Sequence, residues 1–283
     1  MGASLLCPRP TMPADPELRT LDVQIPSQPE PLLRLSLLMA EEEVNLAALS
    51  ALIESDMALA AAVLKAVNSS LYGLAGRVKS VQQSIAYLGM REVAGIALEF
   101  GLRAVFPPAP ELEAMWSRAA QRGMIMGRLA QAMQMDGWAA HAAGLFEECG
   151  KAVLLRHAPD HYRTMLRAAR SDTMLCELEA AGFGVGHDAL GAALCESWGL
   201  SASVVACVRH HVLAQADQVL PATLKHRDIL ALSVLARTMM VEPAGLDECV
   251  MHIAPQCNVD TRGLLRAARR VQAELEEALA HRR

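Results

Sequence analysis

Acidic and imidazole side chains that could bind a divalent cation are concentrated in the second half of the chain. Glu147 and Glu148 are adjacent in the segment AAGLFEECGK, and Lys151 follows within one helical turn. The histidines further along the chain include His187, His210 and His211. Carboxylate oxygens and imidazole nitrogens are common ligands of divalent metals, and a bound metal can activate water for attack on phosphorus. The two glutamates and the three histidines are therefore candidate metal ligands.

These groups can meet only if the segments that carry them pack against one another, and the composition favours helices for those segments. Apolar residues make up 53% of the chain and aromatic residues only 4%, so the core must be built from Leu, Ala, Val and Met. That mixture favours helices over strands. Apolar positions recur with helical spacing from Pro31 nearly to the C-terminus, without convincing strand alternation. We therefore expect an all-α protein.

Prolines mark the expected boundaries between segments. Residues 1–30 contain six prolines and little apolar periodicity, which predicts a flexible Pro-rich leader that could cross the domain surface as a strap. The helical pattern breaks again at three closely spaced prolines, Pro107, Pro108 and Pro110. We expect an N-terminal helical subdomain over residues 31–106 and a second helical subdomain, with a C-terminal helix, over residues 107–283.

Charge and targeting patterns exclude several classes of function. The net charge of −5 provides no general attraction for nucleic acid or for an anionic membrane. No apolar run reaches the ~18 residues that a membrane span needs, and the N-terminus lacks the pattern of a secretion signal. The seven cysteines include no CxxC pair, and their odd number argues against a disulfide framework. We expect a cytoplasmic protein that binds neither nucleic acid nor membrane.

Three stretches, in order along the chain, resemble a known domain family. Glu54–Gly73, with the sequence ESDMALAAAVLKAVNSSLYG, carries an E-x-D start and an N-S-x-x-Y-G end. Val78–Leu98 and Gly186–Val205 fit the continuation of this pattern. The chain thus resembles HDOD domains over about residues 31–240. These domains are a catalytically degenerate branch of the HD phosphohydrolase superfamily in bacterial signalling proteins. The resemblance implies an N-terminal helical subdomain packed on a degenerate HD-type helical subdomain.

The same resemblance implies that metal ligands of an active HD hydrolase are missing. Glu147 and Glu148 stand where active relatives carry an adjacent His–Asp pair. Arg118 stands at the position of a first ligand histidine, and Val234 stands at that of a late aspartate. The residues that remain resemble the second-metal set of HD-GYP phosphodiesterases: Lys151, His187, His210 and His211. We expect no catalytic residue, metal or cofactor, with these histidines hydrogen-bonded around a degenerate pocket.

Alternatives in which this pocket still binds a ligand stay open. The two glutamates and three histidines could form an adventitious metal site, or the site of a divergent metal-dependent phosphohydrolase. Arg118 would oppose a metal, because a guanidinium can neutralise a glutamate and occupy the space of an ion. The loss of even one metal ligand also typically costs orders of magnitude in activity. Arg118 and Lys151 could instead hold the phosphate of a nucleotide without hydrolysing it.

The function that the resemblance implies is regulatory. We expect a bacterial signal-transduction module that acts by binding a protein partner, in circuits that involve cyclic di-GMP or two-component systems, with a nucleotide as a further candidate ligand. A purely structural interaction module is a second alternative to the enzyme. Asn68, Ser69 and Tyr72 could present polar groups to a partner, or could satisfy loose backbone groups where a helix ends. Apolar spacing in the C-terminal helix allows a homodimer or packing on its own domain.

Overall fold

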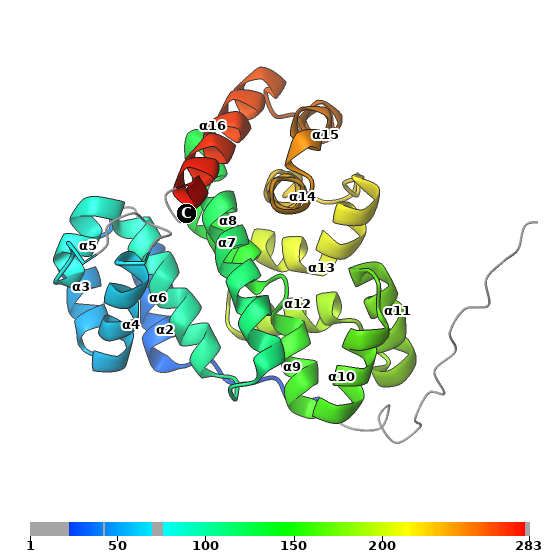
Figure 1. Ribbon diagram of the computed structural model, residues 1–283, viewed down its shortest axis with the longest axis horizontal. Helices are drawn as coiled ribbons and strands as arrows, with labels where there is room; N and C mark the ends of the chain where they lie inside the picture. The colour runs from blue at the N-terminus through cyan, green and yellow to red at the C-terminus, as the bar shows by residue number, and fades with distance from the viewer. Residues whose placement is uncertain (1–22, 42, 70–75, 281–283) are drawn as a thin grey trace, which may run out of the picture.

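The computed structural model describes residues 23–41, 43–69 and 76–280, and these residues form helices joined by turns, with no strand (Figure 1). The expectation of an all-α fold is confirmed. The first group of helices comprises α2 (Glu30–Met39), α3 (Leu46–Glu54), α4 (Met57–Val67), α5 (Val81–Leu88) and α6 (Met90–Ala104). In Figure 1 this group lies to one side, and α6 faces the helices that follow.

The second group is larger and contains the candidate site. Its first helices are α7 (Pro110–Ala132), α8 (Gly137–Phe146), α9 (Cys149–His157), α10 (Pro159–Ala168), α11 (Asp172–Phe183) and α12 (His187–Ser197). They are followed by α13 (Ala202–Asp217), α14 (Arg227–Val241), the short η1 (Pro243–Gly245), α15 (Leu246–Ile253), η2 (Ala254–Cys257) and α16 (Thr261–Ala280). The helix α6 contacts both α7 and α8, so the two groups share one continuous core.

Local capping signals start several of these helices. The Asn45 side chain accepts hydrogen bonds from two backbone N–H groups in the first turn of α3. At α5, Ser80 Oγ accepts from the N–H of Gln83 at 3.1 Å, while Gln83 Oε1 accepts from the N–H of Lys79 at 2.8 Å. Such caps satisfy backbone donors that have no partner within the helix. These helix starts depend on residues that are near in sequence.

Glycines allow the close helix crossings that assemble the site. A Cβ atom placed on Gly144 of α8 would lie 2.9 Å from the Cα atom of Gly123 in α7. A Cβ on Gly150 of α9 would lie 2.0 Å from the carbonyl oxygen of His187 at the start of α12. Any larger side chain would force these helices apart. The first crossing brings the end of α8 against α7, and the second brings α9 against α12.

An extended segment before α2 contacts the second group of helices. Residues 23–29 are not helical, and the carbonyl oxygen of Pro26 accepts a hydrogen bond from Trp198 Nε1 at 2.8 Å. Pro26 is buried, and the Trp198 ring packs edge-on against Phe146. Residues 23–29 of the expected leader therefore cross the second group of helices as an extended segment, whereas residues 1–22 lie outside the described residues.

The C-terminal helix α16 packs on its own chain. Its apolar side chains Leu264, Ala268 and Val271 are buried, and it contacts α7 and α15. Among the described residues no single helix is long and apolar enough to cross a membrane. The helices α3 and α4 satisfy the length and composition criteria only as a pair, across a bend of 113°.

Candidate functional site

Two buried carboxylates lie at the centre of the second helical group. Glu147 follows the last residue of α8, and Glu148 precedes the first residue of α9. Glu147 is 0% exposed and Glu148 is 3% exposed. A buried carboxylate is unfavourable unless it is paired and hydrogen-bonded, so the partners of these two groups define the chemistry of the site.

The guanidinium of Arg122 lies between the two carboxylates. Its Nε atom is 3.0 Å from Glu147 Oε2, and its Nη2 atom donates a hydrogen bond of 2.9 Å to Glu148 Oε1. Arg122 is itself buried in α7, where Gly123 and Gly144 permit the close approach of α8. One delocalised cation therefore bridges the two adjacent carboxylates.

Three further charged groups complete this network. Arg118 donates to Glu148 through Nη2 at 2.7 Å and through Nε at 3.3 Å. The Nζ atom of Lys151 is 3.4 Å from Glu148 Oε2 and 2.7 Å from Asp172 Oδ1. The network thus contains three carboxylates, of Glu147, Glu148 and Asp172, and three cations. We call these six residues the ion-pair network: Arg118, Arg122, Glu147, Glu148, Lys151 and Asp172.

The neighbouring charges keep the members of the network ionised. Burial alone would raise the pKa of Glu148, but Lys151, Arg122 and Arg118 outweigh it and hold that pKa far below its usual range. Burial would likewise lower the pKa of Lys151, but Glu148 and Asp172 raise it. Both groups therefore remain charged at neutral pH.

Uncharged groups also contact Glu147. Gln215 Nε2 donates to Glu147 Oε2 at 2.8 Å and also lies 2.8 Å from Ser233 Oγ. The Cys207 thiol contacts Glu147 Oε1 at 3.9 Å, and burial, followed by the charge of Glu147, raises the pKa of that thiol well above its usual value. Ser233 precedes Val234, which is buried and offers no ligand atom.

The histidines separate into two environments. His187 donates its backbone N–H to Glu179 Oε2 at 2.7 Å, and its Nδ1 atom lies 2.7 Å from the same oxygen. The other oxygen of Glu179 accepts from the hydroxyl of Tyr162 at 2.6 Å. His211 is also buried, with Nδ1 2.7 Å from the Val208 carbonyl oxygen and its ring 5.7 Å from that of His187. By contrast, His210 is only half-buried, and within the described residues it makes no hydrogen bond or ion pair with the network.

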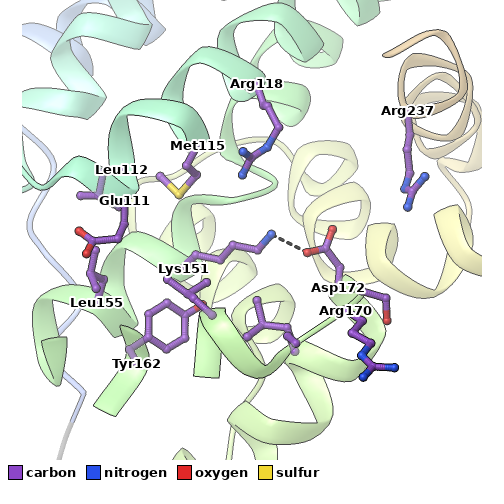
Figure 2. Close-up of a pocket in the computed structure, with 14 residues that line it drawn as sticks. Glu111, Leu112, Met115, Arg118, Lys151, Leu155, Tyr162, Arg170, Asp172 and Arg237 are labelled. Atoms are coloured by element: carbon purple, nitrogen blue, oxygen red, sulfur yellow. Dashed lines mark hydrogen bonds and ion pairs between the residues drawn. The ribbon is translucent and has the colours of Figure 1, made fainter. Parts of the chain in front are cut away.

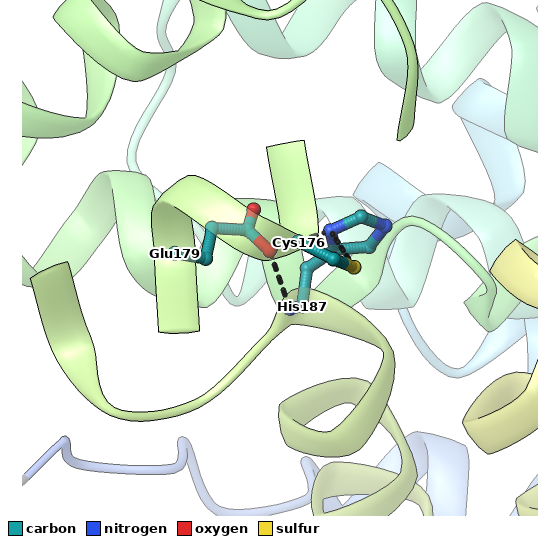
Figure 3. Close-up of side chains that lie close together, drawn as sticks. All are labelled: Cys176, Glu179 and His187. Atoms are coloured by element: carbon teal, nitrogen blue, oxygen red, sulfur yellow. Dashed lines mark hydrogen bonds and ion pairs between the residues drawn. The ribbon is translucent and has the colours of Figure 1, made fainter. Parts of the chain in front are cut away.

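The geometry does not fit the metal centre of a hydrolase. Among the described residues, the one group of three ligand atoms within 4.8 Å of one another is Cys176, Glu179 and His187 (Figure 3). The five candidate ligands named from the sequence form no such group. His187 Nε2 is buried without a hydrogen-bond partner in the described part of the chain, and so are Nη1 and Nε of Arg122, although Nε lies 3.0 Å from Glu147 Oε2. A guanidinium bound to both glutamates takes the oxygens that a metal would need.

An open pocket of about 510 Å³ lies beside the ion-pair network (Figure 2). In Figure 2 Lys151 reaches across to Asp172, while Arg118 and Arg237 approach the same region from α7 and α14. The polar lining residues include Arg118, Lys151, Arg170, Asp172 and Arg237. The pocket therefore exposes one edge of a network that is otherwise enclosed.

The sequence identified four of the six members of the network and missed two. Glu147, Glu148, Lys151 and Arg118 come together as candidates, and His187 and His211 lie nearby. Arg122 and Asp172 were missed, although Arg122 lies one helical turn after Arg118, on the same helix face. That spacing was the available signal for Arg122, and no comparable local pattern marks Asp172.

The polar turn after α4 is engaged in internal hydrogen bonds. Asn68 Nδ2 lies 2.9 Å from the Leu64 carbonyl oxygen and 2.8 Å from that of Val78, and Asn68 Oδ1 accepts from the N–H of Val78. The N–H of Ser69 donates to the carbonyl oxygen of Ala66. Tyr72 lies outside the described residues. The Asn68 side chain thus ties the end of α4 to the segment before α5.

The fold and the site can be compared with known proteins. The family model of the HDOD domain matches residues 25–213, about two thirds of the chain. The chain belongs to the HDOD domain family. An uncharacterized protein of Treponema pallidum (strain Nichols) is 28% identical over 206 residues, which cover 69% of this chain and 39% of that protein. The HDOD chain therefore spans about two fifths of that relative's length.

Solved structures share this fold at low sequence identity. An HDOD domain protein of unknown function from Geobacter sulfurreducens has a TM-score of 0.69 at 18% identity, over 90% of this chain and 93% of that chain. A protein from Marinobacter aquaeolei VT8, provisionally named a signal transduction protein, has a TM-score of 0.68 at 23% identity, over 92% and 60% of the two chains. At these identities the likeness shows a common fold.

Proposed function

We propose that this HDOD chain is a non-catalytic signalling module that acts by binding a protein partner. The observation that carries the proposal is the Arg122 guanidinium, which bridges Glu147 and Glu148 at 3.0 and 2.9 Å. Hydrolysis by an HD-type mechanism needs converging ligands and a metal-activated water at this place. Here a permanent cation neutralises the carboxylates instead.

Physical chemistry supports this reading of the pocket. A divalent ion entering between Glu147 and Glu148 would have to displace a guanidinium and would face the positive charges of Arg118 and Lys151. At separations of about 4 Å, like charges in a partly buried site repel by several kcal/mol. The position of Val234 also provides no oxygen ligand. The network therefore favours the ionised, metal-free arrangement.

The wider role follows from the family. We propose that the chain belongs to a cytoplasmic bacterial circuit linked to cyclic di-GMP or two-component signalling, and that the surface of the helical fold recognises the partner. This chain covers 39% of the Treponema pallidum relative and 60% of the Marinobacter aquaeolei chain, which supports a role in which HDOD domains act together with other parts of a longer protein. The pocket beside the network is then free to bind a ligand that modulates partner binding.

Metal analysis and turnover assays on the purified chain distinguish a non-catalytic binding module from a phosphohydrolase. We expect sub-stoichiometric Fe, Mn and Zn, and no hydrolysis of cyclic di-GMP or bis-p-nitrophenyl phosphate above a no-protein control, with or without added Mn²⁺. Hydrolysis that Glu147→Gln and Glu148→Gln both abolish would instead assign the chain as a divergent phosphohydrolase.

Partner binding is tested by affinity capture from the native cell, followed by titration of the captured protein with purified chain. We expect a saturable complex with a defined stoichiometry. If no captured protein binds saturably after purification, the partner-binding role is refuted and a purely structural module remains.

A further inference from the structure

The pocket beside the ion-pair network has a surplus of positive charge. Its lining includes four cations, Arg118, Lys151, Arg170 and Arg237, and two carboxylates, Glu111 and Asp172. Both carboxylates are already paired, because Glu111 Oε1 accepts from Arg163 at 2.7 Å and Asp172 Oδ1 binds Lys151 at 2.7 Å. The surplus therefore lies on side chains that these carboxylates do not neutralise.

Arg170 and Arg237 are the cations without a counter-charge. Within the described part of the chain neither guanidinium has an ion pair or a hydrogen-bond partner, whereas Arg118 and Lys151 both bind Glu148. Arg170 is exposed and precedes α11, and Arg237 is half-buried on α14. The two side chains therefore reach the pocket from separate elements, Arg170 from the segment before α11 and Arg237 from α14.

Two weaker features add to this attraction for an anion. The side chain of Arg118 is 50% exposed, so it can contact a ligand while it holds Glu148. The first turn of α11 also borders the pocket, and Ser171 caps it by accepting from the N–H of Met174 at 3.1 Å. The positive end of a helix dipole favours nearby anions.

Most of the remaining lining is apolar and could contact a ring. Five apolar side chains of α7, α9, α10 and α11 line the pocket: Leu112, Met115, Leu155, Leu166 and Leu175. The volume of about 510 Å³ falls within the ~300–1,000 Å³ of small-molecule sites. An apolar wall beside a cationic rim suits a molecule with one anionic end and one flat or apolar end.

We infer that this pocket binds a small phosphate-bearing molecule, and that Arg170 and Arg237 hold its phosphate. A guanidinium presents two parallel N–H donors that match phosphate oxygens, and such charge-assisted hydrogen bonds are among the strongest in proteins. The inference rests on the proposed function, since a chain that hydrolysed phosphoesters would release such a molecule rather than retain it.

The test is calorimetric titration of the full chain with three probes: inorganic phosphate, pyrophosphate and AMP. We expect the affinity to rise from phosphate to pyrophosphate because more charge is bound, and AMP to exceed phosphate if the apolar wall contacts the base. Arg237→Gln and Arg170→Gln should each weaken pyrophosphate binding by about tenfold or more, and Arg237→Lys should lose less. Arg266→Gln, a change of an exposed arginine on α16, is the matched control and should bind as the unchanged chain does.

Two titration results would refute phosphate binding in this pocket. Absence of binding by all three probes refutes the inference, provided that circular dichroism shows the unchanged chain to be folded. Binding that is equal in the unchanged chain, Arg237→Gln and Arg170→Gln reveals an adventitious ion only, and likewise refutes it. Neither result affects the proposed partner binding, which is measured separately by capture and titration. If both glutamine variants unfold, the Arg237→Lys variant and the salt dependence of pyrophosphate affinity still distinguish ionic binding from its absence.

Discussion

Replacing Arg122 by methionine tests whether its guanidinium holds the centre of the fold together. The substitution keeps most of the side-chain volume but removes the charge between Glu147 and Glu148. Glu148 retains Arg118 and Lys151, whereas Glu147 retains only uncharged neighbours such as Gln215. The penalty should therefore fall mainly on Glu147, which is 0% exposed.

The size of the effect follows from the burial of the pair. Removing one partner of a buried ion pair typically costs about 3–5 kcal/mol, because the other charge is left uncompensated. Arg122→Met should lose about that much free energy of unfolding. Glu147→Gln in the same chain removes the orphaned charge, so the double variant should recover about 1–3 kcal/mol of the loss. The coupling between the two substitutions measures their interaction.

The assay is urea denaturation followed by circular dichroism, with m-values compared between variants. Arg34→Met is the matched control, because Arg34 binds Glu30 at 2.6 Å on the surface, where both side chains are more than half exposed. An exposed pair of this kind contributes at most about 1 kcal/mol. If Arg122→Met costs no more than Arg34→Met, or if Glu147→Gln gives no recovery, the argument that Arg122 neutralises the buried carboxylates is wrong.

Three other predictions concern the packing around the site. Burial lowers the pKa of the His141 imidazole from 6.5 to about 4. The stability that the neutral imidazole contributes is therefore present above pH 6.5, and about 3 kcal/mol of it is lost as the pH falls toward 4. His141→Gln should flatten the dependence of the unfolding free energy on pH. Gly150→Ala should lower the free energy of unfolding by about 1–3 kcal/mol through its clash with the His187 carbonyl, whereas Gly245→Ala, where the nearest atom is 3.8 Å away, should change thermal stability little. Trp198→Phe removes the hydrogen bond to the extended N-terminal segment and should cost about 1 kcal/mol in chemical denaturation, with faster proteolysis of that segment; unchanged proteolysis would contradict the role of this contact.

Local sequence patterns predicted the helices well because their determinants are local. The cap at Asn45 and the reciprocal bonds of Ser80 and Gln83 join residues that are only two to four positions apart. The helical periodicity likewise predicted an all-α fold without reference to tertiary contacts, and the observed helices confirm it. These signals depend on residues two to four positions apart, which a single sequence displays directly.

The candidate site was only partly predictable because its partners come from distant segments. Arg122 meets Glu148 across 26 residues, and Lys151 meets Asp172 across 21 residues. No periodicity connects such positions. The sequence singled out Arg118 as the group that would neutralise a glutamate, and Arg118 does bind Glu148, but the bridging position belongs to Arg122. Which arginine enters the interior depends on the crossing of α7 with α8.

The interlocked charges of the centre also bear on how such a fold can evolve. Each of the three cations and three carboxylates is held by a member of opposite sign, and Glu147 depends on Arg122 for its ion pair, so a substitution of Arg122 leaves a buried charge without its partner. A histidine in place of Arg122, for example, would remove the guanidinium before any metal could compensate Glu147. Intermediates of this kind carry a stability deficit of about 3–5 kcal/mol, comparable with the whole margin of a typical domain. A metal ligand at the position of Arg122 would therefore require a compensating change at Glu147.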